Sequence, residues 1–335
     1  MKSKIFISED IKNYKKGRDI LDKITNYTLI GSEEEFVNMI KSKKLTYTEE
    51  KQYMFFGVKK GKFLKEYHLD EKFRGIKEEY YLSYENNCPF NCLYCYLREY
   101  YGHGAFVFYV NIEDMFSELD EFKKKNAMIS CGIVNDSLVL DSITGITKDL
   151  IDYFKKREDL ILEIRSKSKN IANLIETGGS ENIITSFTFS PQDVISKYEL
   201  GTASLEERVD AAVKLQQAGF KIGLRIDPMI NVENCNEKYS EMIDLIFAKL
   251  DRSKIANIGI GSMRYRKGLK QLVTKEVKTD LFYGEIIIGI DGKERYFKKI
   301  RLDMYKNIVA KIKEYGEYEI YLGMEPDYVW DEVFK

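Results

Sequence analysis

The sequence has few of the residues that cross-link a chain or bind a single metal ion: five cysteines and two histidines among 335 residues. It contains four prolines, so no Pro-rich linker divides it. No run of 18 apolar residues is present, and the first residues lack the apolar core of a signal peptide. These absences argue against a membrane span and a disulfide-stapled secreted domain, and they predict a cytoplasmic protein.

The chain also has no excess of positive or negative charge. The 53 basic and 54 acidic residues leave a net charge of -1, so a nucleic-acid partner would have to bind a local patch rather than a general basic field. A hydrophobic fraction of 44% over this length is enough for one large α/β domain, or a large and a small one.

Three of the few cysteines fall within eight residues, in Cys88-Pro-Phe-Asn-Cys92-Leu-Tyr-Cys95. A short turning loop lets three thiolates converge on a soft polynuclear metal group. Zinc usually needs a fourth Cys or His, and no second Cys or His pair stands nearby. The pattern favours a 4Fe-4S cluster with one iron left open, with a zinc site or a disulfide pair as the alternatives.

From about residue 76, strand patterns alternate with amphipathic helices, which predicts parallel βα units. Polar residues repeatedly follow the strand ends, where the loops of a parallel barrel line one mouth. We therefore expect a partial (β/α)6 barrel, similar to a TIM barrel, over residues 76–335, preceded by an N-terminal α/β extension over residues 1–75. A hairpin with the turn Asp291-Gly292 is expected near the end of the barrel domain.

The cysteine spacing resembles that of the radical S-adenosylmethionine (SAM) superfamily. That resemblance implies a 4Fe-4S cluster whose open iron binds SAM, and a 5'-deoxyadenosyl radical that abstracts hydrogen from a substrate. Further segments resemble the spore photoproduct lyase family of that superfamily. They include Asn135-Asp136-Ser137-Leu138, Ser166-Lys167, Ser190-Pro191, Gly223-Leu-Arg-Ile-Asp-Pro228, Arg295-Tyr-Phe297 and Tyr321-Leu-Gly-Met-Glu325.

The resemblance implies three catalytic candidates. Tyr94 and Tyr96 stand where the lyases have tyrosines beside the cluster, with aromatic packing as the alternative role. Cys131 is the candidate hydrogen-donor thiol, with a buried strand cysteine as the alternative. The lyase cysteine lies three residues before the aspartate that matches Asp136, whereas Cys131 lies five before it. On a strand, a shift of two residues keeps the same face but moves the side chain by about 7 Å.

The resemblance also implies binding residues. Lys167, Ser190 and Glu199 would hold SAM, with Asp136 and Ser137 near its ribose or methionine moiety, and salt bridges or helix caps are the alternatives. Substrate candidates are Arg225, Arg295 and Tyr296. Arg225 and Asp227 would either form a structural ion pair or line the substrate mouth.

The implied activity is repair of a methylene-bridged thymine dimer in damaged DNA, with a reductant such as flavodoxin or ferredoxin as partner. The alternative is radical SAM chemistry of the same family on a substrate other than DNA, favoured by the displaced Cys131 and the neutral charge. A zinc-stabilised binding module without turnover is a third reading of the cysteines.

Overall fold

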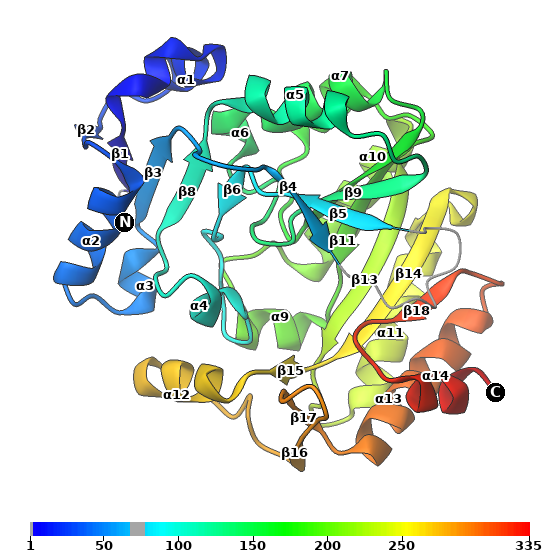
Figure 1. The fold of residues 1–335 in the computed structure, drawn as a ribbon. Helices are drawn as coiled ribbons and strands as arrows, with labels where there is room; N and C mark the ends of the chain where they lie inside the picture. Colours follow the sequence, from blue (N-terminus) through cyan, green and yellow to red (C-terminus); the bar gives the residue numbers. More distant parts are fainter. Residues whose placement is uncertain (1–2, 68–77) are drawn as a thin grey trace.

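A computed structural model describes residues 3–67 and 78–335, and the boundary expected at residue 75 lies outside them. The chain builds an eight-stranded curled sheet and a five-stranded sheet that lies beside it (Figure 1). The cysteine loop lies where the chain passes between these sheets, because strands of both precede and follow it.

The eight-stranded sheet is the expected partial barrel. Its parallel strands are neighbours in the order in which they occur along the chain, as βα units require. One more parallel strand, β18 (Ile320–Leu322), extends it at one edge, and β4 (Leu64–Tyr67) pairs antiparallel at the other. The parallel strands between these two are β5 (Glu79–Leu82), β9 (Ala127–Cys131), β10 (Leu160–Ser166), β11 (Ile183–Thr188), β13 (Lys221–Met229) and β14 (Ile255–Ser262).

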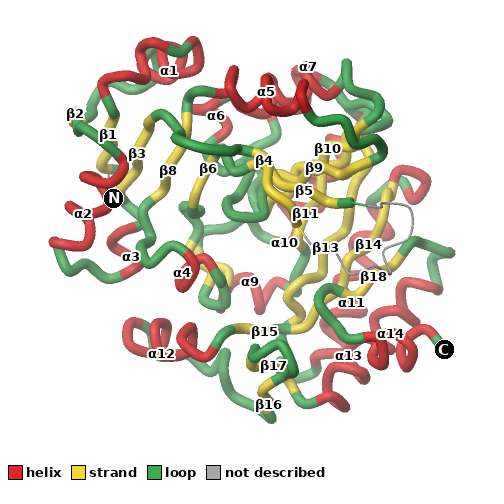
Figure 2. The backbone as a smooth tube through the Cα atoms, viewed as in Figure 1, coloured by secondary structure: helices red, strands yellow, loops and turns green. Residues whose placement is uncertain are grey.

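Amphipathic helices cover the convex face of this sheet, and Figure 2 shows them in red around the yellow strands. Ser204 and Glu207 form a capping box at the start of α10. The covering helices are α7 (Ile146–Phe154), α8 (Ala172–Thr177), α10 (Leu205–Gln217), α11 (Cys235–Lys249) and α13 (Lys298–Lys313), and α5 (Ile112–Glu121) packs near β4.

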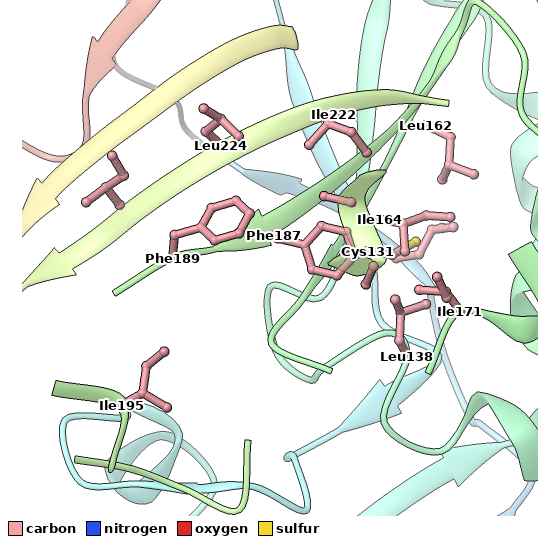
Figure 3. Packing of buried hydrophobic residues seen from close by; sticks show 14 of the residues in the cluster. Cys131, Leu138, Leu162, Ile164, Ile171, Phe187, Phe189, Ile195, Ile222 and Leu224 are labelled. Carbon is pink, nitrogen blue, oxygen red and sulfur yellow. The ribbon is translucent and has the colours of Figure 1, made fainter. Parts of the chain in front are cut away.

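Strand alternation gives the sheet two different faces. Leu162, Ile164 and Phe187 pack on the helix side, in a large apolar core (Figure 3). Met128 and Ile184 come from strands two positions apart in the sheet, yet they share a separate small cluster with partly buried Tyr321 of the edge strand β18. Residues so far apart meet only inside a curled sheet, so this cluster marks the concave interior.

The five-stranded sheet corrects one expectation about the chain's organisation. The apolar segment around Phe106 reads as a barrel strand, but β8 (Phe106–Tyr109) pairs parallel with β3 (Tyr53–Gly57) of the N-terminal region. Conversely, β4 precedes residue 75 and joins the barrel. The buried Phe106 segment suits either sheet, and β4 is a half-polar edge strand, so long-range pairing rather than local pattern decides their place. The remaining strands of this sheet are β1 (Lys4–Ile7), β2 (Thr28–Leu29) and β6 (Glu85–Asn86), and its first helices are α1 (Lys15–Leu21), α2 (Glu33–Ser42) and α3 (Tyr47–Glu50).

The C-terminal hairpin forms as predicted. Strands β16 (Ile286–Ile288) and β17 (Glu294–Tyr296) pair antiparallel, and Gly292 takes the left-handed φ of 73° that its turn needs. β15 (Arg264–Tyr265) adds a third strand, and α12 (Lys267–Glu276) and α14 (Asp327–Phe334) flank the region. Among the described residues no helix is long and apolar enough to span a membrane.

Candidate active site

The three-cysteine loop is held by backbone pairing. It runs from β6 through β7 (Asn91–Cys92) to α4 (Leu97–Tyr100). β7 pairs antiparallel with β12 (Glu199–Leu200), which follows α9 (Gln192–Tyr198), so that Cys92 lies opposite Glu199. The Leu93 amide also donates to the Tyr198 carbonyl at 2.8 Å. A loop that would otherwise be flexible is thus fixed to the barrel.

The three thiols fit a polynuclear cluster. All are free; Cys88 and Cys92 are buried and Cys95 is half-buried. Burial raises the pKa of Cys92 to about 12, the Lys167 ammonium opposes that shift, and the Cys95 thiol adds to it. In the described part of the chain, no three or more His, Cys, Asp or Glu side chains are close enough together to hold a single metal ion. Thiolates that bind different irons of one cubane need not converge as closely, and the soft donor set suits iron and sulfide.

Two cations donate to the backbone of the loop. The Lys51 ammonium donates to the Cys88 carbonyl at 2.5 Å, and Arg98 Nε donates to the Cys92 carbonyl at 3.3 Å. Burial lowers the pKa of Lys51, and the Cys88 thiol opposes that shift. The sequence gives no sign of the Lys51 contact, because Lys51 lies in the N-terminal region, far from the loop along the chain.

Glu199 lies beside the loop but is already fully engaged. Its carboxylate forms an ion pair with Arg208 at 2.5 Å, accepts from Ser190 Oγ at 3.0 Å, and accepts a short hydrogen bond from the Tyr94 hydroxyl. Although burial opposes its ionisation, the Arg208 guanidinium holds the pKa of Glu199 below its usual range. Glu199 and Ser190 therefore hold Tyr94 and the loop, and their predicted contact with SAM stays a prediction.

Asp136 has a comparable structural role. It accepts from Ser166 Oγ at 2.8 Å and from the Lys167 amide at 2.7 Å, so it joins the loops that follow β9 and β10. Burial raises the pKa of Asp136 despite these hydrogen bonds. It lies close enough to Cys88 to raise the pKa of that thiol, after the larger effect of burial. Its predicted place near the ribose or methionine moiety of SAM stays a prediction.

Ser137 and Lys167 are the groups still able to bind a ligand. The buried Ser137 Oγ has no hydrogen-bond partner among residues 3–67 and 78–335, and no carboxylate in those ranges pairs with the Lys167 ammonium. The Lys167 ammonium lies 5.7 Å from the centre of the Tyr94 ring, and its charge acts on the Cys92 thiol. The Lys167 ammonium can therefore bind a carboxylate such as that of SAM, whereas Ser137 lies beside the Tyr84 hydroxyl and its predicted place near SAM stays a prediction.

The structure separates the three catalytic candidates. The Tyr94 hydroxyl points at Glu199, whereas the Tyr96 hydroxyl donates to the Ile133 carbonyl at 2.5 Å and its side chain is 47% exposed. Cys131 is fully buried on the helix-covered face of β9, with Leu138, Ile164 and Ile171 around it (Figure 3). Its neighbour Ser130 faces the interior instead, so the Cys131 thiol points away from the barrel mouth.

A charged network fills the concave interior. The buried Glu163 pairs with Arg165 at 2.6 Å and more closely with Arg225, and it accepts from Ser186 at 2.5 Å. Although burial opposes ionisation, the two guanidinium groups hold the pKa of Glu163 well below its usual range. Sequence reasoning missed this network, although Glu163 and Arg165 share one strand face two residues apart.

Arg225 and Asp227 do not pair with each other. Arg225 belongs to the Glu163 network, and Asp227 forms an ion pair with Arg264 at 2.9 Å. Glycines make room for these side chains, since a Cβ at Gly261 would lie 2.6 Å from the Asp227 carboxylate. Of the two alternatives for these residues, the mutual ion pair is wrong, and their place at the substrate mouth stays a prediction.

Arg295 and Tyr296 anchor the hairpin. Arg295 is buried and forms an ion pair with Asp291 at 2.5 Å, and the buried Tyr296 hydroxyl accepts from the Asn231 amide at 3.1 Å. The hairpin instead exposes apolar side chains near its turn, Ile288 at 68% and Ile290 at 95%. The predicted contact of Arg295 and Tyr296 with substrate stays a prediction, and the exposed side chains of the turn are these isoleucines.

Comparison with known proteins agrees with this geometry. The family model described as spore photoproduct lyase matches residues 1–317. The spore photoproduct lyase of Bacillus subtilis is 24% identical over 326 residues, covering 93% of this chain and 91% of the relative. That of Clostridium acetobutylicum is 25% identical over 304 residues, covering 88% and 86%.

Solved structures show the same fold. A spore photoproduct lyase complexed with dinucleoside spore photoproduct superposes with a TM-score of 0.81 at 18% identity, covering 96% of this chain and 99% of the other. A mutant lyase with bound SAM and dinucleoside spore photoproduct gives 0.76 at 17% identity, covering 96% and 98%. With the family model matching nearly the whole length, the chain is an enzyme of the spore photoproduct lyase family of radical SAM enzymes, whose cofactors are a 4Fe-4S cluster and SAM.

Proposed function

We propose that this chain repairs spore photoproduct, the methylene-bridged thymine dimer, in DNA. The observation that carries the proposal is the family match over residues 1–317, which spans the cysteine loop, Ser137 and Lys167. When bound, the cluster and SAM supply the 5'-deoxyadenosyl radical that takes hydrogen from C6 of the lesion. The rival reading, the same chemistry on a substrate other than DNA, is not favoured by the comparisons.

Different residues of the chain bind the cluster and SAM. Cys88, Cys92 and Cys95 hold the cluster, and Lys167 binds the carboxylate of SAM, because its ammonium lies over the Tyr94 ring beside the loop and forms no ion pair with a described residue. The Glu163 network keeps the interior polar and rigid beneath the mouth. An electron donor such as flavodoxin or ferredoxin and a cytoplasmic location remain predictions, supported by thiols that stay free in a reducing compartment.

In this proposal Tyr96, rather than Cys131, would return a hydrogen atom to the repaired thymine, and the tyrosyl radical left behind would take a hydrogen atom back from 5'-deoxyadenosine. Tyr96 is half exposed and reaches the loop after β9, whereas the Cys131 thiol faces the helix-covered core. The donor role of Cys131 stays a prediction that a Cys131→Ala variant tests directly. We expect this variant to give the same products as the wild type, and a new SAM adduct or aberrant thymine product would restore Cys131 as the donor.

The hairpin is the part of the molecule suited to opening duplex DNA. Enzymes that act on bases must bring the target out of the stack, and inserted apolar side chains do this in many DNA-bending proteins. Ile288 and Ile290 stand exposed at the turn, and Arg295 and Tyr296 fix the base of the hairpin. We therefore propose that the hairpin turn moves the lesion out of the duplex, and that the reaction takes place at the barrel mouth.

The first experiment measures the reaction itself. Anaerobically reconstituted protein is given dithionite, SAM and synthetic dinucleoside spore photoproduct, and thymine recovery and 5'-deoxyadenosine are followed by chromatography. We expect lesion-dependent return to thymines, abolished in a Cys92→Ala variant. A wild-type protein with an intact cluster that cleaves SAM but leaves the lesion untouched would refute the proposed substrate.

A second experiment separates chemistry from eversion. Ile290→Asp should lower the rate on a lesion in duplex DNA by tenfold or more, yet leave the rate on the dinucleoside unchanged, because a dinucleoside needs no opening. Ile175→Asp is the matched control, since Ile175 is also exposed, at 44%, but lies on α8, which contacts α7 and α10. Equal losses on both substrates would contradict the role of the hairpin.

A further inference from the structure

The N-terminal region reaches the cluster loop through one lysine. Lys51 directly follows α3, and its ammonium donates to the Cys88 carbonyl at 2.5 Å. Arg98, in α4 just beyond the last cluster cysteine, donates to the Cys92 carbonyl at 3.3 Å and to Asn91 Oδ1 at 2.5 Å. Two cations from distant parts of the chain thus each bind the backbone of a cluster cysteine.

One aromatic ring joins these two cations. The Lys51 ammonium and the Arg98 guanidinium each lie 4.5 Å from the centre of the Tyr47 ring. The Tyr47 amide donates to Glu276 of α12 at 2.7 Å, and the same glutamate lies 3.9 Å from Arg98. The ring is therefore fixed between α4 and α12, and it holds both cations where water is scarce.

The Lys51 ammonium forms no ion pair with a carboxylate among residues 3–67 and 78–335, although the Glu50 carboxylate is near enough to feel its charge. Its direct contacts there are a backbone carbonyl and the Tyr47 ring. A cluster held by three thiolates is anionic and gains a further negative charge when it is reduced. A fixed cation nearby stabilises the reduced form more than the oxidised form, and burial strengthens the effect.

We propose that Lys51, Arg98 and Tyr47 form a cation clamp that positions the cluster loop and raises the reduction potential of the cluster. The clamp gives the N-terminal region a part in electron uptake, in addition to its structural sheet. It depends on the cluster and not on the substrate, so it is measured without any DNA lesion.

The test is a redox titration of anaerobically reconstituted protein, followed by electron paramagnetic resonance. Lys51→Met keeps the length of the side chain and removes the charge. We expect its reduction equilibrium constant to fall tenfold or more, a shift of about 59 mV to more negative potential for one electron. Lys51→Arg should restore the wild-type potential, and Lys43→Met, which removes an exposed lysine after α2, is the matched control.

Each possible result either supports or refutes the cation clamp. A Lys51→Met protein that folds but retains iron poorly, while Lys51→Arg retains it fully, would support the positioning role of the clamp. A Lys51→Met midpoint equal to that of Lys43→Met, with full iron content, would overturn the proposal, as would a Lys51→Arg midpoint as negative as that of Lys51→Met. Wild-type protein that retains the cluster but leaves spore photoproduct untouched would refute the proposed substrate and not the clamp.

Discussion

The buried ion pair between Arg208 and Glu199 should be a large single contribution to the integrity of the active site. Both side chains are fully buried, and Glu199 also accepts from Tyr94 and Ser190. Replacing Arg208 with methionine leaves a carboxylate in a site without water or a compensating cation in contact with it. Removing one partner of such a pair costs about 3–5 kcal/mol.

The assay is urea unfolding of the cluster-free protein, followed by circular dichroism, because it reports the loss without any contribution from iron. We expect Arg208→Met to lose about 4 kcal/mol of unfolding free energy. The double variant Arg208→Met with Glu199→Gln should recover at least half of that loss, since a neutral amide can still contact Tyr94 and Ser190. Lys249→Met is the control, because its ion pair with Asp210 is exposed and contributes at most about 1 kcal/mol.

Two results would refute this reasoning. One is an Arg208→Met protein within about 1 kcal/mol of the wild type, since the carboxylate would then be solvated or paired elsewhere. The other is a double variant whose loss equals the sum of the two single losses, because independent sites add and coupled sites do not. Either result would remove Glu199 as the residue that fixes Tyr94 beside the cluster.

Three further predictions follow from other parts of the molecule. Burial lowers the pKa of Lys59 to about 8, so its charge destabilises the fold at neutral pH, and Lys59→Met should be about 1 kcal/mol more stable at pH 7. Equilibrium unfolding should show this gain fall as the pH rises above 8 and vanish above about pH 11, where the lysine is neutral in the unfolded state as well. Lys167→Met should weaken SAM binding by tenfold or more in equilibrium dialysis while leaving the iron content unchanged. Gly259→Ala should lower the unfolding free energy by about 1–3 kcal/mol, because the added Cβ would lie 2.6 Å from the Tyr321 ring. Gly284→Ala is the comparison: φ at Gly284 is 117° and no atom lies near the added Cβ, so this variant tests backbone strain without a steric contact.

The sequence by itself determined the features that depend on short spacing. Cys88, Cys92 and Cys95 identify the cluster loop because a chelating turn is local, and its ligands cannot be far apart along the chain. The alternation of strands and helices determined the partial barrel for a similar reason, since each βα unit packs against its neighbour in sequence. The hairpin turn at Asp291-Gly292 likewise needs only the local conformation of a glycine.

The tertiary structure alone decided what depends on pairing between distant segments. β8 joined the N-terminal sheet because β3 offered it an edge, and no local pattern encodes that choice. Ser130 and Cys131 are adjacent on β9, so their side chains point to opposite faces of the sheet: Ser130 faces the interior and Cys131 faces the covering helices. Lys51 reached the cluster loop only because the N-terminal sheet packs beside the barrel. Spacing along the chain predicts which sulfur atoms bind iron, and long-range packing decides which charges and thiols lie around them.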